Sequence, residues 1–153
     1  MLYKSNKVIP MNIKQISVFI ENKEGRLKKA LETIGKSNIN IRALSIADTS
    51  KFGILRLIVS DNKKAIKQLK ENHFIVKETD VLVAEIPDEP NGLAGILDIL
   101  DKAKINLEYL YAFTSNKTNQ AIVVIRVENV EKSIEYLKEG NTVLLSQEDI
   151  EKL

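Results

Sequence analysis

The feature that most constrains this sequence is that its second half repeats its first. Sliding the sequence along itself by 66 residues aligns identical residues between positions 27 and 44, and after a two-residue insertion near 117–119 an offset of 68 aligns further identities. The identical pairs are Leu27/Leu93, Leu31/Leu97, Lys36/Lys102, Ile39/Ile105, Asn40/Asn106, Leu44/Leu110, Ile54/Ile122, Val59/Val127, Ile66/Ile134, Leu69/Leu137, Lys70/Lys138 and Glu71/Glu139. Because only two copies are present, the pattern predicts two small related domains that share an interface, and not a long solenoid.

Within each copy the hydrophobic periodicity changes in a fixed order. Apolar residues alternate over 16–20 and again over 82–86, which predicts a first strand with one face buried. Apolar residues then recur at i, i+3, i+4 and i+7 from Leu27 and from Leu93, which predicts a helix whose apolar stripe covers a sheet. A hairpin follows in each copy, because runs rich in β-branched residues flank a turn-like segment. These runs are 39–47 and 52–60, then 105–113 and 120–127.

A second helix and a short last strand complete each copy. Asp61 and Asn129 occupy equivalent positions ahead of new apolar stripes, where their side-chain oxygens can accept hydrogen bonds from the first turn of a helix. Short strands are predicted at 74–76 and 142–145. The fold class is therefore α+β, a ferredoxin-like βαββαβ unit repeated twice, with antiparallel sheets and helices on one face. We expect both copies to join one sheet with the four helices on one side.

The predicted domains follow from the repeat. Residues 1–11 have no counterpart in the second copy and form an N-terminal extension, 12–79 form the first domain, and 80–153 form the second. No segment rich in Pro, Gly or Ser separates the two domains. The last residues, 147–153, are expected to form a helical turn capped by Ser146.

The composition of the 153-residue chain excludes several classes of protein. Hydrophobic residues make up 44%, enough for a core, yet no apolar run approaches the roughly 18 residues of a membrane span and no secretory signal is seen, so we expect a cytoplasmic protein without membrane contact. There is no Cys, and His73 is the single His. We therefore expect no metal site, no cofactor and no catalytic relay built on Cys or His. His73 is expected to be an exposed or locally bonded residue.

The charge is unevenly distributed between the copies. Residues 1–80 contain 16 Lys and Arg against 8 Asp and Glu, whereas 81–153 contain 7 against 13. Opposite charges favour contact between the halves or with a symmetry mate, although uneven solvation of two surfaces explains the same numbers. So acidic a second half argues against a nucleic-acid partner.

The best-marked candidate site is the junction between the first strand and the first helix. It reads Glu-Asn-Lys-Glu-Gly-Arg-Leu over 21–27, and its Gly25 allows a sharp turn that leaves helix amides uncovered. Such amides attract an anion, and Asn22 brings a donor and an acceptor suited to a zwitterionic amino acid. The alternative is an ordinary strand-to-helix turn in which Asn22 bonds locally.

These residues carry a resemblance to a known family. The segment 21–27, followed by Asn-Ile-Asn-Ile over 38–41, resembles the ACT domain, a βαββαβ regulatory module that binds amino acids, and residues 12–145 resemble small tandem ACT proteins. The family's first loop is Asp or Asn, any residue, Pro, Gly, with a Leu two positions on. Residues 22–25 lack the Pro, whereas 88–91 keep the Pro but have Asn91 in place of Gly.

The resemblance implies a site shared between two domains, formed by the first loop of one and the start of the second strand of the other. The implied ligand-binding residues are Asn22, Gly25, Leu27, Asn40 and Ile41 in the first copy and Asp88, Asn91, Gly92, Leu93, Asn106 and Leu107 in the second. The repeated Asn40 and Asn106 also suit a turn at a helix exit. Tyr109, Tyr111 and Phe113 alternate along one side of a strand, as core residues or as the wall of a pocket.

The function implied is a non-catalytic regulatory protein that binds a free amino acid between ACT domains, and we expect a homodimer. The alternative is a tandem ACT module for interaction or assembly, with no small ligand. RNA binding is disfavoured because only Phe52 is aromatic in its strand. Acylphosphatase-like hydrolysis occurs on the same fold, but the sequence has no phosphate-cradling loop beyond Gly25.

Overall fold

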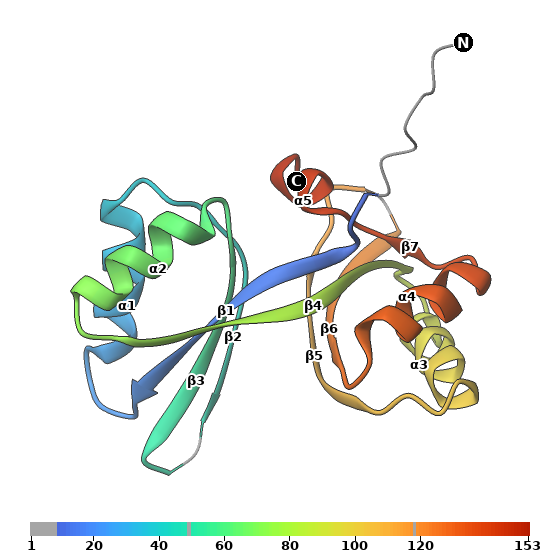
Figure 1. Ribbon diagram of the computed structural model, residues 1–153, viewed down its shortest axis with the longest axis horizontal. Coiled ribbons are helices and arrows are strands. Elements are labelled where there is room, and N and C mark those ends of the chain that lie inside the picture. The colour runs from blue at the N-terminus through green and yellow to red at the C-terminus, as the bar shows by residue number, and fades with distance from the viewer. Residues whose placement is uncertain (1–8, 49, 118) are drawn as a thin grey trace.

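The computed structural model describes residues 9–153 except 49 and 118, so most of the predicted extension 1–11 lies outside the described residues. Strands and helices alternate along the chain as the repeat predicts (Figure 1). The first copy contains β1 (Asn12–Glu21), α1 (Arg26–Lys36), β2 (Ile41–Asp48), β3 (Phe52–Val59) and α2 (Asn62–Glu71). After β4 (Ile75–Pro87), the second copy contains α3 (Gly92–Lys102), β5 (Leu107–Thr114), β6 (Gln120–Val127), α4 (Val130–Glu139), β7 (Val143–Leu144) and α5 (Gln147–Glu151). The predicted α+β class and the doubled βαββαβ order are confirmed.

One long strand, β4, belongs to both copies. Residues 75–82 of β4 pair antiparallel with β1, and residues 82–87 pair antiparallel with β6. β4 is thus the last strand of the first copy and the first strand of the second, and the predicted boundary between 79 and 80 falls inside it. The strands form one antiparallel sheet in the order β2-β3-β1-β4-β6-β5, with β7 beside β4. The expected shared sheet is present.

Each copy buries its own helices against the sheet. In the first copy, alternate residues of β1 and β3 pack beneath α1 and α2. In the second, Leu82, Ala84 and Ile86 of β4 pack beneath α3 and α4. Val76 of β4 has the same parity and packs against the first core, so the helices of both copies lie on the same face of β4. Each pair of helices is on one face of its sheet, as predicted.

The four helices nevertheless do not form one layer. Figure 1 shows α1 and α2 at one end of the molecule and α3 and α4 at the other. The cause is the twist and coiling of the sheet, which brings the edge strands β2 and β5 close to each other. The four helices therefore share one face of β4, as expected, but the twist of the six-strand path separates the two pairs.

The coiled sheet encloses a third core between the two copies. Its members come from both copies and from the C-terminal segment: Ile13, Ala43, Ile58, Val81, Val83, Ile122, Val124, Leu145 and Ile150, with Tyr111, Phe113 and Leu153 packed against them. The chain end is fastened to the first copy by Arg42, whose guanidinium donates to the carbonyl oxygens of Leu153 (2.6 Å) and Glu151 (3.1 Å).

A buried polar cluster lies in the same inter-copy space. Gln15 of β1 is fully buried, and its side chain donates to Tyr109 Oη at 2.8 Å and accepts from Tyr111 Oη at 2.8 Å. The guanidinium of Arg56 lies 3.7 Å from the centre of the Tyr109 ring. Burial and the neighbouring Tyr109 raise the pKa of Tyr111, so its hydroxyl stays protonated. Tyr109 and Tyr111 thus bind the first copy, and Phe113 packs in the third core.

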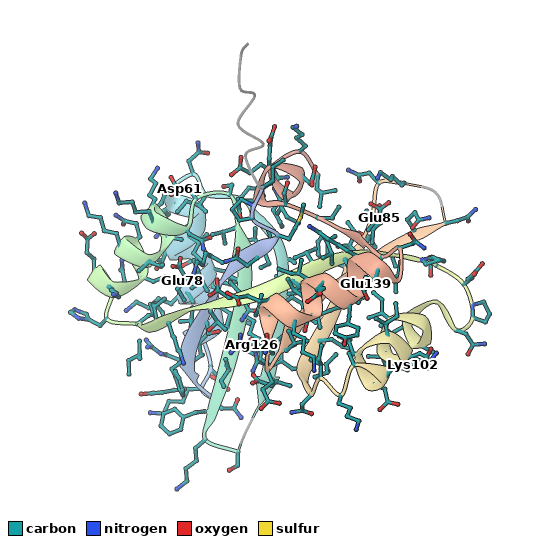
Figure 2. The ribbon with its side chains drawn as sticks, turned by 45° about the vertical axis from the view of Figure 1, so that its right-hand side comes forward. Asp61, Glu78, Glu85, Lys102, Arg126 and Glu139 are labelled. Carbon is teal, nitrogen blue, oxygen red and sulfur yellow. The ribbon has the colours of Figure 1, made fainter. Side chains whose placement is uncertain are left out.

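The predicted helix caps are confirmed. Asp61 accepts from the amide of Lys64 at 3.0 Å at the start of α2, which Figure 2 shows at the edge of the first copy. Asn129 accepts from the amide of Lys132 at 3.0 Å. Ser146 and Asp149 bond reciprocally at the start of α5, and the backbone amide of Ser146 holds the pKa of the Asp149 carboxyl below its usual value.

The Gln15 cluster yields a stability prediction. Gln15→Ala leaves two tyrosine hydroxyls of the second copy without their partner, so the free energy of unfolding should fall by about 1–3 kcal/mol in urea titrations. Gln68→Ala removes a glutamine of α2 whose side chain bonds the exposed Glu71, and should cost about 0.5 kcal/mol or less. Equal losses in the two variants would contradict a role for the cluster in joining the copies.

Candidate ligand-binding site

The first loop of copy one joins β1 to α1 through a left-handed turn. The amide of Asn22 donates to the carbonyl of Lys51 at 2.9 Å, which fixes the loop beside the β2–β3 hairpin. Gly25 then adopts φ +79° and precedes α1. The left-handed turn therefore falls at the glycine, as the sequence predicts, because residues with a Cβ are strained at this value of φ.

The equivalent loop of copy two repeats these features with different residues. The amide of Asp88 donates to the carbonyl of Asn119 at 2.9 Å, and Asn91 takes the left-handed position with φ +65°. A Cβ on the next residue, Gly92, would lie 2.1 Å from the carbonyl oxygen of Pro87. Gly92 is therefore required by close backbone contact, and Asn91 replaces the family's glycine.

The two helices that start at these loops differ from the other two repeat helices in how they begin. The residues preceding α2 and α4 cap them with side-chain oxygens, whereas Gly25 and Asn91 give no side-chain cap to α1 and α3. Within the described residues, the amides of Leu27 and Lys28 have no acceptor, and neither do those of Leu93 and Ala94. The open amides and the helix dipole make both starts attractive to an anion.

A small cavity of about 160 Å³ adjoins the first loop. Its lining residues are Ile20, Glu21, Asn22, Lys23, Leu27, Ile46 and Gly53. Asn22 and Leu27, both predicted site residues, therefore meet there. Ile46 and Gly53 of the hairpin were not predicted as site residues. They line the cavity because the hydrogen bond between Asn22 and Lys51 holds the hairpin against the loop.

A larger hollow of about 470 Å³ adjoins the second loop. Asn91 and Gly92 line it, together with Glu85, Ile86, Pro87, Glu89, Gly95, Ile96, Ile99, Gln120, Gly140, Asn141, Thr142 and Val143. Asp88 and Leu93 are not among the lining residues. Asp88 is exposed at the loop, and Leu93 packs against the second core. Most of the lining comes from the ends of α3, α4 and β7, which the loop motif did not indicate.

The start of the second strand lies elsewhere in each copy. The carbonyl of Asn40 accepts from Ser60 and that of Asn106 accepts from Glu128, while both side chains are exposed. The left-handed residues at the helix exits are Asn38 and Lys104, two positions earlier. Ile41 packs against the first core, and Leu107 lines a separate hollow with Leu97, Asp98 and Ile105.

The two halves of the predicted site do not meet within one copy. In the first copy, Glu21 pairs with Phe52 and Ile41 pairs with Val59, so the loop and the start of β2 lie at opposite ends of β3. Seven residues of strand separate these ends by roughly 23 Å. The second copy has the same spacing along β6, from Gln120 opposite Pro87 to Val127 opposite Leu107. A shared site therefore needs halves from different copies or different chains.

Other chemistry finds little support in the described part of the chain. No group of three or more His, Asp or Glu side chains among the described residues is arranged to hold a metal ion. His73 is exposed and takes φ +64° at the end of α2. None of the helices in the described ranges combines the length and apolar character needed to cross a bilayer.

Comparison with known proteins identifies the family. The family described as ACT domain pair matches residues 11–153. The chain belongs to the ACT domain pair family. Among solved structures, protein BT0572 from Bacteroides thetaiotaomicron is similar, with 49% sequence identity, 94% of this chain and 98% of that chain covered, and a TM-score of 0.88. No curated protein sequence matches the chain.

More distant structures share the fold. The ligand-free regulatory subunit of aspartate kinase from Thermus thermophilus has 16% identity and a TM-score of 0.61, with 83% of this chain and 91% of that chain covered. The corresponding subunit from Thermus flavus has 16% identity and a TM-score of 0.61, with coverages of 87% and 95%. At this identity the similarity shows the arrangement of the ACT pair and no more.

The left-handed turn before α1 can be tested by substitution. Gly25→Ala places a Cβ in a disfavoured conformation and should lower the free energy of unfolding by about 1–2 kcal/mol. Gly35→Ala, within the same helix and with no atom within 4 Å of the added Cβ, should raise it by up to about 1 kcal/mol. Thermal or urea unfolding measures both effects, and a neutral Gly25→Ala would contradict the strained turn.

Proposed function

We propose that this protein is a non-catalytic regulatory protein that binds a free amino acid at the first loops of its ACT domains, as a homodimer. The observation that carries the proposal is the pair of uncapped helix starts at Gly25 and Asn91, beside which the structure has cavities of about 160 and 470 Å³. The other two repeat helices have side-chain caps at Asp61 and Asn129, so the uncapped starts coincide with the loops that the family uses for effectors.

The chemistry of the loops suits a zwitterion. The carboxylate of an amino acid is attracted to the open amides at the start of α1 or α3. Its ammonium group has acceptors at Asn22 in the first copy and at the carboxylate of Asp88 in the second. Ile41 and Leu107, when contributed by another copy or chain, remain to select the side chain, whereas Tyr111 is held by Gln15 in the third core. The regulatory subunits of aspartate kinase, with the same fold, support a regulatory role.

An exposed apolar strip supports a homodimer. Phe19 of β1 lies directly opposite Ile75 of β4 and, on its other side, Ile54 of β3. Phe19 is 48% exposed and Ile75 is 70% exposed, on the face of the sheet that α1 and α2 do not cover. A second chain on this face buries apolar surface and supplies the other half of a shared site.

A ligand screen tests the function. Any amino acid that binds only the native state should raise the melting temperature in proportion to its concentration relative to Kd, and calorimetry should then give a saturable isotherm. Asn22→Ala and Asp88→Ala should weaken binding unequally, each by about tenfold to a hundredfold, because each removes a hydrogen bond to a charged group.

Glu135→Ala serves as the control for these variants, since Glu135 is an exposed carboxylate on α4 away from both loops. It should bind as the unaltered protein does. If an amino acid binds and neither Asn22→Ala nor Asp88→Ala changes its affinity, the assignment of the loops is wrong. If no proteinogenic amino acid binds, the protein is an interaction module without a small ligand.

The dimer has its own test. Light scattering should give twice the chain mass, and Phe19→Asp should shift the protein to monomer because a charge in the centre of the apolar strip opposes its burial. Lys63→Glu, a charge change at an exposed residue of α2, on the face of the sheet opposite the apolar strip, should leave the dimer intact. A monomer at every salt concentration in the unaltered protein would contradict the proposed assembly.

A further inference from the structure

The face of the first copy that α1 and α2 do not cover is ordered in rows that cross its strands. Its middle row is apolar, with Phe19 of β1 between Ile54 of β3 and Ile75 of β4. Residues of one strand that share a face are two positions apart, so Glu21 and Ser17 of β1 lie on this face in the rows on either side. Each row is roughly 7 Å from the next. The apolar row is therefore bordered by Glu21 on one side and by Ser17 on the other.

The row that contains Ser17 is cationic. Arg56 of β3 and Lys77 of β4 flank Ser17, each one strand away at roughly 5 Å. The guanidinium of Arg56 stacks on the Tyr109 ring, and its buried Nε has no hydrogen-bond partner. Lys77 is exposed. Within the described part of the chain, neither cation forms an ion pair with a carboxylate, so this row carries two positive charges without a counterion.

The row on the other side of Phe19 carries a negative charge. Glu21 ends β1, and its carboxylate lies 3.2 Å from the ammonium group of Lys23. Both side chains are exposed, 46% for Glu21 and 74% for Lys23, so solvent screens the pair and it holds the carboxylate only weakly. The carboxylate is thus free to exchange this partner for cations that are less exposed to water. The apolar row separates this carboxylate from the cationic row.

This order of charges is self-complementary under one two-fold rotation. When two identical sheets stack face to face, a two-fold axis that runs along the apolar row sets the strands of the two chains antiparallel and exchanges the outer rows. Glu21 of one chain then lies between Arg56 and Lys77 of the other. An axis parallel to the strands would place each row on itself, so that Lys77 of one chain would oppose Arg56 of the other. Like charges in contact oppose association, and the charge pattern therefore selects the first axis.

The second copy covers the face inward of these rows. The next residue of β1 on this face, Gln15, is fully buried beneath Tyr109 and Tyr111 of β5, whose hydroxyls bond to its side chain. A second chain is therefore limited to the three rows centred on Phe19. These are the rows that the axis brings into contact, so the two-fold contact matches the surface that the second copy leaves open. Stacked sheets interdigitate their side chains over such a contact at a separation of roughly 10 Å.

We propose that two chains associate face to face through these three rows, with Glu21 of each chain held between Arg56 and Lys77 of the other. The apolar row supplies the buried surface, and the two symmetric sets of ion pairs fix the register and the antiparallel orientation of the strands. Both cations then have the counterion that the described residues of a single chain do not provide. This inference rests on the homodimer of the proposed function and assigns its contact residues and its orientation.

Two charge reversals test the orientation. Glu21→Lys and Lys77→Glu each place like charges at both symmetric contacts, so each variant alone should have a dimer dissociation constant at least about tenfold higher in sedimentation equilibrium. When the two variants are mixed, the chain with Glu21→Lys and the chain with Lys77→Glu oppose unlike charges at both contacts. Native mass spectrometry, with one variant isotopically labelled, should therefore show more heterodimer than random exchange of chains gives.

Glu32→Lys and Lys63→Glu are the matched controls. They make the same two charge changes at exposed residues of α1 and α2, the helices on the opposite face of the sheet. Each should dimerise with the dissociation constant of the unaltered protein, and their mixture should give the random proportion of heterodimer. All four variants should keep the melting temperature of the unaltered protein, because none of the replaced side chains is buried.

The outcomes separate this inference from the proposed homodimer. A tighter dimer in Lys77→Glu would show that Lys77 opposes a cation, as the axis parallel to the strands requires, and would overturn the inference. If Phe19→Asp dissociates the dimer while neither charge reversal weakens it, or if the mixture gives only the random proportion of heterodimer, the homodimer stands and this inference fails. If the unaltered protein is a monomer at every concentration, both fail.

Discussion

The architecture depends on the pairing of one strand, β4, with both copies. Its 13 residues hydrogen-bond to β1 over the first part and to β6 over the last, so the second copy cannot separate from the first without breaking a strand in half. A flexible linker would permit two independent domains. Because the strand is continuous, the sheet itself fixes how the two copies are oriented, and the twist of the sheet determines the angle between them.

The polar centre of β4 shows why the strand is continuous. Residues 77–80 read Lys-Glu-Thr-Asp, a composition typical of a loop, and the repeat places the boundary there. Asp80 is held from β1 by Lys14 at 2.7 Å and by Asn12 at 3.0 Å, and these partners lower the pKa of its carboxyl. Arg126 donates to its carbonyl from β6. Side chains of the flanking strands therefore stabilise an extended segment that intrinsic propensity alone disfavours.

The local features of the fold were predictable from the sequence, and the long-range ones were not. The caps at Asp61 and Asn129 and the left-handed turn at Gly25 depend on neighbouring residues, so their sequence patterns predicted them. The coiling of the sheet and the burial of Gln15 against the tyrosines of β5 depend on twist accumulated over six strands, for which no local pattern exists. The candidate site shows the same division, since the sequence predicted the turns of its loops but not the hollow formed by the ends of α3, α4 and β7.

The repeat itself explains how one backbone path can enclose two different interiors. Left-handed residues recur at equivalent positions, Asn38 with Lys104 and His73 with Asn141, so the backbone path is common to both copies although the residue types differ. Turn geometry constrains φ, and several residues tolerate it, whereas the contents of a cavity depend on side-chain volume and charge. In the first copy Arg26 lies over the ring of Phe74, whereas in the second the equivalent residues, Gly92 and Thr142, line a hollow. The two copies therefore differ in the space beside the first loop without differing in the path of the chain.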